Sequence, residues 1–237
     1  MAERSHDVLP QADGSMQRRQ VLQRVATIVR QRATGARPVL VAIDGVDGAG
    51  KTVFADELAD MLETQTTVVR ASVDGFHHPA TVRHRRGRGS PEGFFLDSYD
   101  YASLRRLLLA PLRGGSEREI VHAIYDVARE ARVDAPVHAV PADAVLIFDG
   151  IFLHREELRD DWDLSVFLHV PFEISIPRGA GRGYGDPDPS APSNRRYVEG
   201  QRLYLHRCHP ERHATIVIDN SVLAEPEITA DRGHSPG

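Results

Sequence analysis

Apolar residues recur along this chain in two rhythms, one typical of helices and the other typical of buried strands. Helical spacing runs through residues 17–32, where the apolar side chains are Val21, Leu22, Val25, Ile28 and Val29. This spacing predicts an amphipathic helix. Similar patterns predict further helices at residues 51–63, 98–110 and 193–208, with a shorter one near residues 154–159.

Short continuous apolar runs alternate with these helices. Runs of this kind are typical of parallel strands that are buried on both faces. They occupy residues 38–44, 66–74, 144–150, 164–170 and 214–220. Weaker patterns at residues 119–125 and 137–140 predict a small antiparallel β-ribbon. Strands that alternate with helices predict an α/β fold, in which a mostly parallel sheet carries helices on both faces.

The extent of the folded region follows from where these patterns stop. We expect a single domain over residues 17–222, with a loose polar tail at residues 1–16 and another at residues 223–237. Glycine and proline are concentrated in residues 179–193, a stretch too short for a domain linker. It predicts a mobile loop over a site.

Composition narrows the class of protein. The chain has 237 residues, of which 41% are hydrophobic and 27% charged, which is typical of a soluble globular protein. Its net charge of -5 argues against a nucleic-acid partner. No apolar run approaches the roughly 20 residues of a membrane helix, and the N-terminus has no secretory pattern. Cys208 is the only cysteine. We therefore expect a cytoplasmic protein with a small-molecule substrate.

Residues 45–52 read G-V-D-G-A-G-K-T and match the phosphate-binding pattern G-x-x-x-x-G-K-[ST]. Lys51 is the only lysine among the 29 lysines and arginines, and a compact ammonium reaches phosphates inside a tight loop where a planar guanidinium fits poorly. Thr52 offers a hydroxyl to Mg²⁺. The nucleotide-binding residues expected from this loop are Gly45, Asp47, Gly48, Ala49, Gly50, Lys51 and Thr52.

A phosphate loop alone does not choose a reaction. A small GTPase needs an N-K-x-D motif, which this chain cannot form because its one lysine lies in the loop. A motor ATPase usually has a pair of acids, Asp-Glu, after an apolar run, whereas here a single acid, Asp149, follows such a run and precedes a glycine.

Other segments follow the loop in a characteristic order: V-D-G-F-H-H-P (73–79), G-F-F-L-D-S-Y-D (93–100), V-H-A-I-Y-D-V (121–127), L-I-F-D-G-I-F (146–152) and an arginine-bearing stretch after residue 171. Over roughly residues 38–220 the sequence resembles the uridine kinase, phosphoribulokinase and pantothenate kinase group of P-loop kinases, and is most similar to uridine kinase-like proteins. The resemblance implies a P-loop NTPase three-layer sandwich with a mobile lid at about residues 178–196. It also implies ATP as phosphoryl donor and Mg²⁺.

The resemblance also implies roles for individual residues. Asp74, at the carboxyl end of the second predicted strand, would be the general base for the acceptor hydroxyl. From its position at the end of an apolar strand beside the phosphate loop, Asp149 is expected to hold Mg²⁺ through water, whereas Asp44, the alternative acid, precedes the loop and is expected to cap or brace it. Arg178 and Arg182 would close over the phosphates. The sequence departs from the family pattern at two positions, and both departures argue against this role for the arginines. Pro177 is expected to interrupt the helix, and Gly183 stands where an aspartate often follows the second arginine.

An aromatic face with a few polar groups suits a ring-bearing acceptor. The candidate acceptor-binding residues are Phe76, His77, His122, Tyr125, Asp126, Arg195, Arg196 and Tyr204. Each has an alternative structural role in the core or behind the site, and a solvated helix face is the alternative for the two arginines. The basic stretch at residues 83–88 has two interpretations, a loop that attracts an anion or a solvated loop.

The sequence therefore predicts ATP-dependent phosphorylation of a hydroxyl group on a small metabolite, with a nucleoside such as uridine as the first choice of acceptor. Pantothenate or a sugar are alternatives within the same fold. A non-catalytic nucleotide-binding switch is the alternative from another class. Kinases of this group are often oligomeric, so a homo-oligomer is compatible with the resemblance.

Overall fold

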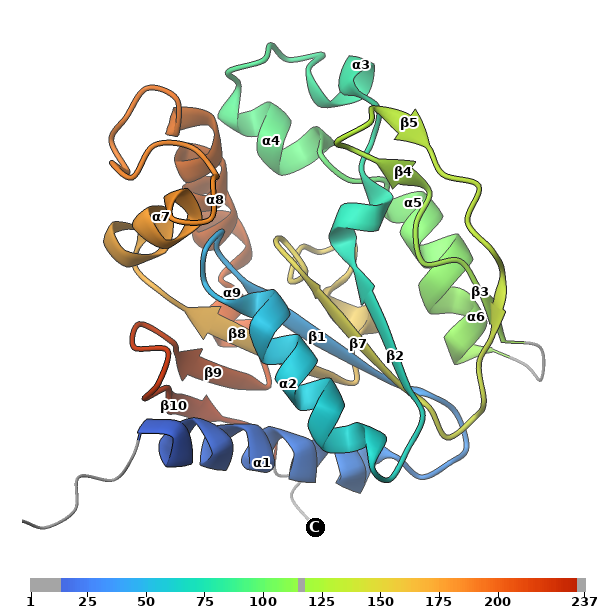
Figure 1. Ribbon diagram of the computed structural model, residues 1–237. Coiled ribbons are helices and arrows are strands. Elements are labelled where there is room, and N and C mark those ends of the chain that lie inside the picture. Colours follow the sequence, from blue (N-terminus) through green and yellow to red (C-terminus); the bar gives the residue numbers. More distant parts are fainter. Residues whose placement is uncertain (1–13, 115–117, 234–237) are drawn as a thin grey trace, which may run out of the picture.

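A six-stranded sheet forms the centre of the computed structural model, which describes residues 14–114 and 118–233 (Figure 1). Its strand order is β10-β9-β8-β1-β7-β2, and every neighbouring pair is parallel except β10 and β9. The strands are β1 (Val39–Gly45), β2 (Val68–Ser72), β7 (Val145–Gly150), β8 (Leu164–His169), β9 (Ile216–Asp219) and β10 (Glu227–Asp231). The five predicted apolar runs form the five parallel strands.

Helices cover both faces of this sheet. Successive residues of β1 point to opposite sides, so that Leu40 packs in one core cluster and Val41 in the other. One face is covered by α1 (Gly14–Arg32) and α2 (Lys51–Glu63). The other is covered by α4 (Pro91–Asp97), α5 (Tyr101–Leu104), α6 (Ala110–Arg113) and α8 (Arg195–Cys208). The predicted three-layer α/β sandwich is confirmed (Figure 1).

The helix predicted at residues 98–110 extends further along the chain than expected. It runs from α5 through a π-helical turn, η2 (Arg105–Leu109), into α6, and Pro111 lies inside it. Because proline has no N–H to donate, the carbonyl of Leu107 lacks its α-helical partner four residues later in the chain. It accepts instead from the N–H of Val121 at 3.0 Å. The proline therefore leaves a carbonyl that ties the helix to the following segment.

The small ribbon is present as two short antiparallel pairs. β3 (Glu119–Ile120) pairs with β6 (His138–Ala139), and β4 (Tyr125–Asp126) pairs with β5 (Ala131–Arg132). The short helix expected near residues 154–159 is a 3-10 turn, η3 (Arg159–Asp161), preceded by irregular turns. A second 3-10 turn, η1 (Val73–Phe76), follows β2, and a short helix, α3 (Ala80–Arg83), comes next.

The expectation of a loose tail after residue 222 is wrong for β10. This strand pairs with β9, and the carboxylate of Asp231 forms an ion pair with Arg24 of α1 at 2.7 Å. An edge strand buries little of its surface, so Glu227–Asp231 is too polar to be recognised from its pattern. At the other end, α1 begins at Gly14, within the stretch expected to be a tail, while residues 1–13 and 234–237 lie outside the described part of the chain.

The lid segment, residues 178–196, begins in the last turn of a helix. α7 (Phe172–Ala180) continues through Pro177, so the expected interruption at this proline is wrong. A loop follows, and the Nδ2 of Asn194 donates to the carbonyls of Asp186 at 2.7 Å and Asp188 at 2.8 Å. α8 then leads to α9 (Pro210–His213) and β9. Movement of the lid segment stays a prediction.

Candidate active site

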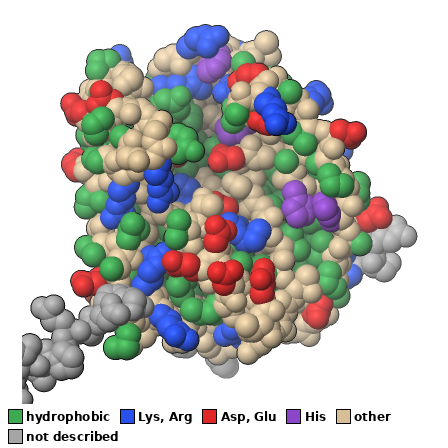
Figure 2. All heavy atoms as spheres, viewed as in Figure 1, with side chains coloured by type: hydrophobic (Ala, Val, Ile, Leu, Met, Phe, Trp, Pro, Cys, Tyr) green, Lys and Arg blue, Asp and Glu red, His purple; other side chains and the backbone are tan. Residues whose placement is uncertain are grey.

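A cavity of about 630 Å³ lies at the carboxyl ends of β1, β2 and β7. Its walls come from the phosphate loop, the turn after β2, the end of β7, the lid segment and the start of α8. In the space-filling view the molecule is hollowed between the α7–α8 side and the α3–β4 side (Figure 2). Ligands of open α/β sheets bind at this edge, because the strand ends and the following turns converge there.

The phosphate loop joins β1 to α2. Gly48 has φ +74°, and a Cβ atom at this position would lie 2.0 Å from the carbonyl oxygen of Ser175 in α7. Only glycine allows this approach, so α7 packs directly on the loop. The Nζ of Lys51 donates to the carbonyl of Val46 at 2.8 Å, within the same loop. This arrangement places an ammonium, a helix N-terminus and open backbone together, which suits phosphate groups.

Thr52 and Asp149 form an oxygen pair beside the loop. The Oγ1 of Thr52 donates to Oδ2 of Asp149 at 2.8 Å, and the other carboxylate oxygen accepts from Arg70 at 3.1 Å. The register of the sheet places Asp149 level with Ile43 of β1 and Ser72 of β2. Hard oxygen ligands of this kind fit Mg²⁺, which keeps several waters and binds through few protein groups. Accordingly, no group of three or more His, Cys, Asp or Glu side chains suited to a metal occurs among the described residues.

Asp74 lines the same cavity and belongs to the 3-10 turn that follows β2. Tyr99 donates its hydroxyl to Oδ1 of Asp74 at 3.3 Å, and the ring of Tyr99 lies 4.5 Å from that of His77. Burial, together with the charge of Asp74, raises the pKa of Tyr99 well above its usual value. Tyr99 therefore remains protonated and acts as a donor to the carboxylate.

Seven of the residues expected to bind ligands line this one cavity: Asp47, Gly48, Lys51, Thr52, Asp74, Asp149 and Arg182. They come from parts of the chain separated by more than a hundred residues, and the parallel sheet brings them together. Gly45, Ala49 and Gly50 belong to the same loop without lining the cavity. Asp44 is buried beneath the loop and accepts from the N–H of Gly45 at 2.7 Å, as its expected bracing role requires.

Phe76 and Tyr204 do not lie in the acceptor pocket, contrary to expectation. Both side chains are at most 2% exposed and pack in the hydrophobic core. The Tyr204 hydroxyl donates to Asp44 and accepts from the N–H of His154 at 3.1 Å. Their aromatic rings face inward because η1 and α8 use these positions to cover the sheet.

Three of the candidate arginines also point elsewhere. Arg178 donates to the carbonyl of Asn220 at 3.0 Å, and Arg196 donates to the carbonyls of Arg83 and Arg88. Burial lowers the pKa of both guanidinium groups. Arg195 is exposed outside the lining of the cavity. Of the lid arginines, Arg182 is the one that lines the cavity.

Three of the remaining acceptor candidates, His122, Tyr125 and Asp126, lie at the ribbon, whereas His77 contacts Tyr99 without itself lining the cavity. The His122 ring lies 4.7 Å from that of His138, and the Tyr125 hydroxyl donates to Glu130 at 2.9 Å. Asp126 accepts from the N–H groups of Ala128 and Arg129, as in a local turn. The Nδ1 of His77 lies 2.9 Å from the carbonyl oxygen of Asp74, and burial lowers the pKa of this histidine.

Sequence reasoning missed several residues that line the cavity. Tyr184 of the lid segment is 75% exposed and Tyr197 of α8 is 45% exposed, and both belong to the lining. Tyr99 was present in the segment at residues 93–100 that carries the resemblance, so a signal for it existed. The others are Ser72, Gly150, Ile151, Ser175, Ile176, Gly179, Gly183, Gly185, Ser193 and Asn194.

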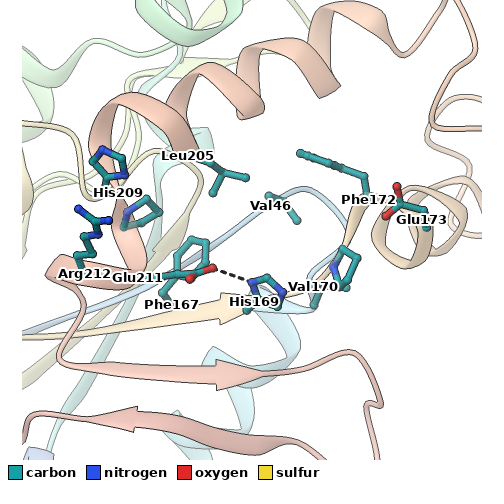
Figure 3. A pocket seen from close by; sticks show the side chains of 12 residues that line it. Val46, Phe167, His169, Val170, Phe172, Glu173, Leu205, His209, Glu211 and Arg212 are labelled. Carbon is teal, nitrogen blue, oxygen red and sulfur yellow. Dashed lines mark hydrogen bonds and ion pairs between the residues drawn. The ribbon is translucent and has the colours of Figure 1, made fainter.

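A second hollow, of about 450 Å³, lies near the phosphate loop between the end of β8, α8 and α9. Val46, Leu205 and Phe172 line one side, and the Nδ1 of His169 meets Glu211 at 2.7 Å on the other (Figure 3). None of the candidate site residues lines it. It is therefore distinct from the cavity that contains Lys51 and Asp74.

The phosphate loop at the end of β1, the acids at the ends of β2 and β7 and the parallel sheet define a P-loop kinase. The model of the phosphoribulokinase / uridine kinase family matches residues 40–182. The chain belongs to this family, and its membership supports a phosphotransferase.

Individual proteins that resemble this chain do so at low sequence identity. A uridine kinase from Ureaplasma urealyticum is 29% identical over 140 residues, which cover 56% of this chain and 63% of that protein. Among solved structures, a possible uridine kinase from Bacillus stearothermophilus has a TM-score of 0.63 at 21% identity, covering 84% of this chain and 98% of that one. A candidate fructose transport system kinase from Silicibacter sp. TM1040 has a TM-score of 0.61 at 25% identity, covering 78% and 94%.

None of the helices in the described part of the chain is both long and apolar enough to cross a membrane.

Proposed function

We propose that this protein transfers the γ-phosphoryl group of ATP to a hydroxyl group of a small metabolite. The observation that carries the proposal is the single cavity in which Lys51, the Thr52–Asp149 pair and Asp74 converge. Phosphoryl transfer needs a clamp for the donor phosphates and a carboxylate near the acceptor hydroxyl, and catalysis consists mainly of positioning and charge stabilisation. These groups supply both parts.

On the donor side, the open backbone of the loop and the N-terminus of α2 would bind the phosphates. Lys51 would turn from the carbonyl of Val46 toward the transferring group, and Arg182 would add a second cation from the lid segment. Thr52 and Asp149 would hold Mg²⁺. When bound, Mg²⁺ neutralises charge on the phosphate oxygens.

On the acceptor side, Asp74 would accept the hydrogen bond of the attacking hydroxyl. Tyr99 donates to the same carboxylate and holds its orientation. A carboxylate is a weak base for an alcohol, so Asp74 orients the hydroxyl and takes its proton late. A loose phosphoryl transition state permits this order of events.

A nucleoside is the proposed acceptor. Family membership supports it, and Tyr184 and Tyr197 offer exposed rings at the cavity on which a base could stack. A sugar is the second candidate, favoured by the likeness to a candidate fructose transport system kinase. Pantothenate is the third candidate within this fold.

The direct test is an ADP-release assay with Mg-ATP over nucleosides, simple sugars and pantothenate. The Asp74→Asn variant is expected to lower kcat by about 10² to 10⁴, while the Kd for ATP changes little because Asp74 lies on the acceptor side. Asp60→Asn, an exposed change on α2, serves as the matched control and should retain wild-type turnover.

Two results would contradict the proposal. ATP binding with no turnover of any acceptor would favour the non-catalytic switch. Near-normal turnover by Asp74→Asn would remove Asp74 from the reaction.

A further inference from the structure

Asp47 is held by a buried side chain of α8 rather than left free in the phosphate loop. Its backbone N–H donates to Oε1 of Gln201 at 2.6 Å, and its Oδ2 accepts from Nε2 of Gln201 at 3.1 Å. This N–H is therefore already paired with Gln201 and is not open to a phosphate. This differs from our expectation that Asp47 contacts the nucleotide.

Gln201 is well suited to hold this residue in place. Its side chain is 1% exposed, and Nε2 also donates to the carbonyl of Tyr197, one turn earlier in α8, at 3.1 Å. Three hydrogen bonds to a buried amide leave it little freedom. The orientation of Asp47 is therefore set by α8, the helix that follows the lid segment.

The Asp47 carboxylate belongs to the same part of the cavity as Asp74. Both line it, and both charges act on the buried hydroxyl of Tyr99. Burial raises the pKa of Asp47, the charge of Lys51 lowers it, and the charge of Asp74 raises it again. The cavity thus presents two carboxylates, and the charges of both act on Tyr99.

Positive charge on the lining is limited to the donor side. Among the described residues the lysine and arginine side chains that line the cavity are Lys51 and Arg182, which the proposed function assigns to the phosphates. Arg178 and Arg196 donate to backbone carbonyls away from it. A carboxylate or phosphate on the acceptor would therefore meet two like charges and no cation of its own.

We propose that Asp47, positioned by Gln201, binds the acceptor and, with Asp74, selects compounds that present hydroxyl or amino donors and carry no anionic group. This inference rests on the proposed function and narrows its substrate class. It favours neutral nucleosides and sugars, or an amino derivative of these, over pantothenate and over phosphorylated sugars.

The first test compares neutral acceptors with anionic analogues that keep a free terminal hydroxyl, using the full-length protein with Mg-ATP. Suitable pairs are pantothenol with pantothenate, uridine with 5-carboxyuridine, and fructose with fructose 1-phosphate and fructose 6-phosphate, so that each terminal hydroxyl of the sugar stays free in one of the two phosphates. The neutral member of the productive pair is expected to have a kcat/KM about 100-fold higher or more. Preference for the anionic member of any pair would overturn the inference while leaving the kinase activity established.

The second test separates acceptor binding from nucleotide binding. Asp47→Asn is expected to lower kcat/KM for the acceptor by about 10- to 100-fold, because a charged hydrogen-bond acceptor is lost. Gln201→Leu should act in the same direction by releasing Asp47. The Kd for ADP, measured by calorimetry without acceptor, should change little in both variants. Glu199→Gln, on the solvent side of α8, is the matched control, since its carboxylate pairs with Arg202 at the surface.

The outcomes distinguish this inference from the proposed function. An increase in the Kd for ADP with an unchanged acceptor KM would place Asp47 on the nucleotide side and overturn the inference alone. If the Gln201→Leu variant misfolds, the Asp47→Asn variant alone tests whether Asp47 binds the acceptor. A wild-type protein that phosphorylates no acceptor, charged or neutral, would overturn the proposed function and this inference with it.

Discussion

A single side chain, Lys51, illustrates how strongly local geometry can select a residue type. The other cations among the 29 lysines and arginines of this chain are arginines. Lys51 stands at the first position of α2, and its Nζ reaches back to the carbonyl of Val46 across the loop. An ammonium on a thin stem fits such a turn, whereas a planar guanidinium needs more room and a different approach.

Lys51→Arg is accordingly expected to lower kcat by about 10² to 10³, the cost of misplacing one charge-stabilising group. The fold should persist, because the substitution keeps the charge and adds no buried polar group outside the loop. Turnover by the ADP-release assay and the Tm by circular dichroism together check this prediction. A variant with the wild-type rate would show that the loop does not bind the transferring phosphates.

At the scale of elements, α8 connects the lid segment to the phosphate loop. Two side chains three residues apart on this helix contact the loop region, Gln201 at Asp47 and Tyr204 at Asp44. Residues at this spacing lie on one helix face. Tyr197, one turn earlier than Gln201, lines the cavity. A displacement of the lid segment would therefore be transmitted through α8 to the start of the phosphate loop.

β10 is the element whose contribution is simplest to test. It adds a strand to β9, its Ile228 packs against the core beneath α1, and Asp231 pairs with Arg24. Removal of residues 225–237 should lower the Tm by about 5 °C or more, because each kcal/mol corresponds to about 2–4 °C in a domain of this size. Removal of residues 234–237 alone is the control. An unchanged Tm in the longer truncation would mean that β10 adds nothing to stability.

At the scale of the whole molecule, Asp163 ties the segment before β1 to the start of β8. Its carboxylate accepts two hydrogen bonds from Arg37 at 2.7 Å and one from the N–H of Leu40 at 2.9 Å. Burial opposes ionisation of Asp163, but these hydrogen bonds and the charge of Arg113 hold its pKa below the usual value. A carboxyl group with a lowered pKa stabilises the fold above its unfolded pKa, and this contribution is lost as the pH falls through the folded value.

Asp163→Asn should therefore lower the free energy of unfolding by about 1–3 kcal/mol at pH 7. The difference from the wild type should shrink as the pH falls below about 4, where the Asp163 carboxyl group of the unfolded chain begins to protonate, and should be lost as the pH passes through the lower folded pKa. Urea unfolding at pH 7 and at a pH below about 4 measures this difference in the free energy of unfolding. Asp160→Asn is the control, because that side chain is 86% exposed and its ion pair with Arg159 is long, at 3.9 Å. If the difference in the free energy of unfolding did not depend on pH, the loss of stability would come from packing and not from charge.

The parallel strands, the phosphate loop and the acids Asp74 and Asp149 could be predicted from local sequence patterns, because these features depend on residues close together in the chain. Short apolar runs mark strands that are buried on both faces, and the loop pattern needs its glycines and lysine at set spacings. The order of these segments also carried the resemblance to the family that the comparisons show.

Only the tertiary structure decided which of the other candidates face the cavity. Phe76 and Tyr204 are ordinary core aromatics, and Arg178 and Arg196 satisfy backbone carbonyls. Conversely, Gln201 had no local signal, since its contact with Asp47 spans 154 residues. The direction of a side chain depends on how elements distant in the chain pack together, and a local pattern does not contain that information.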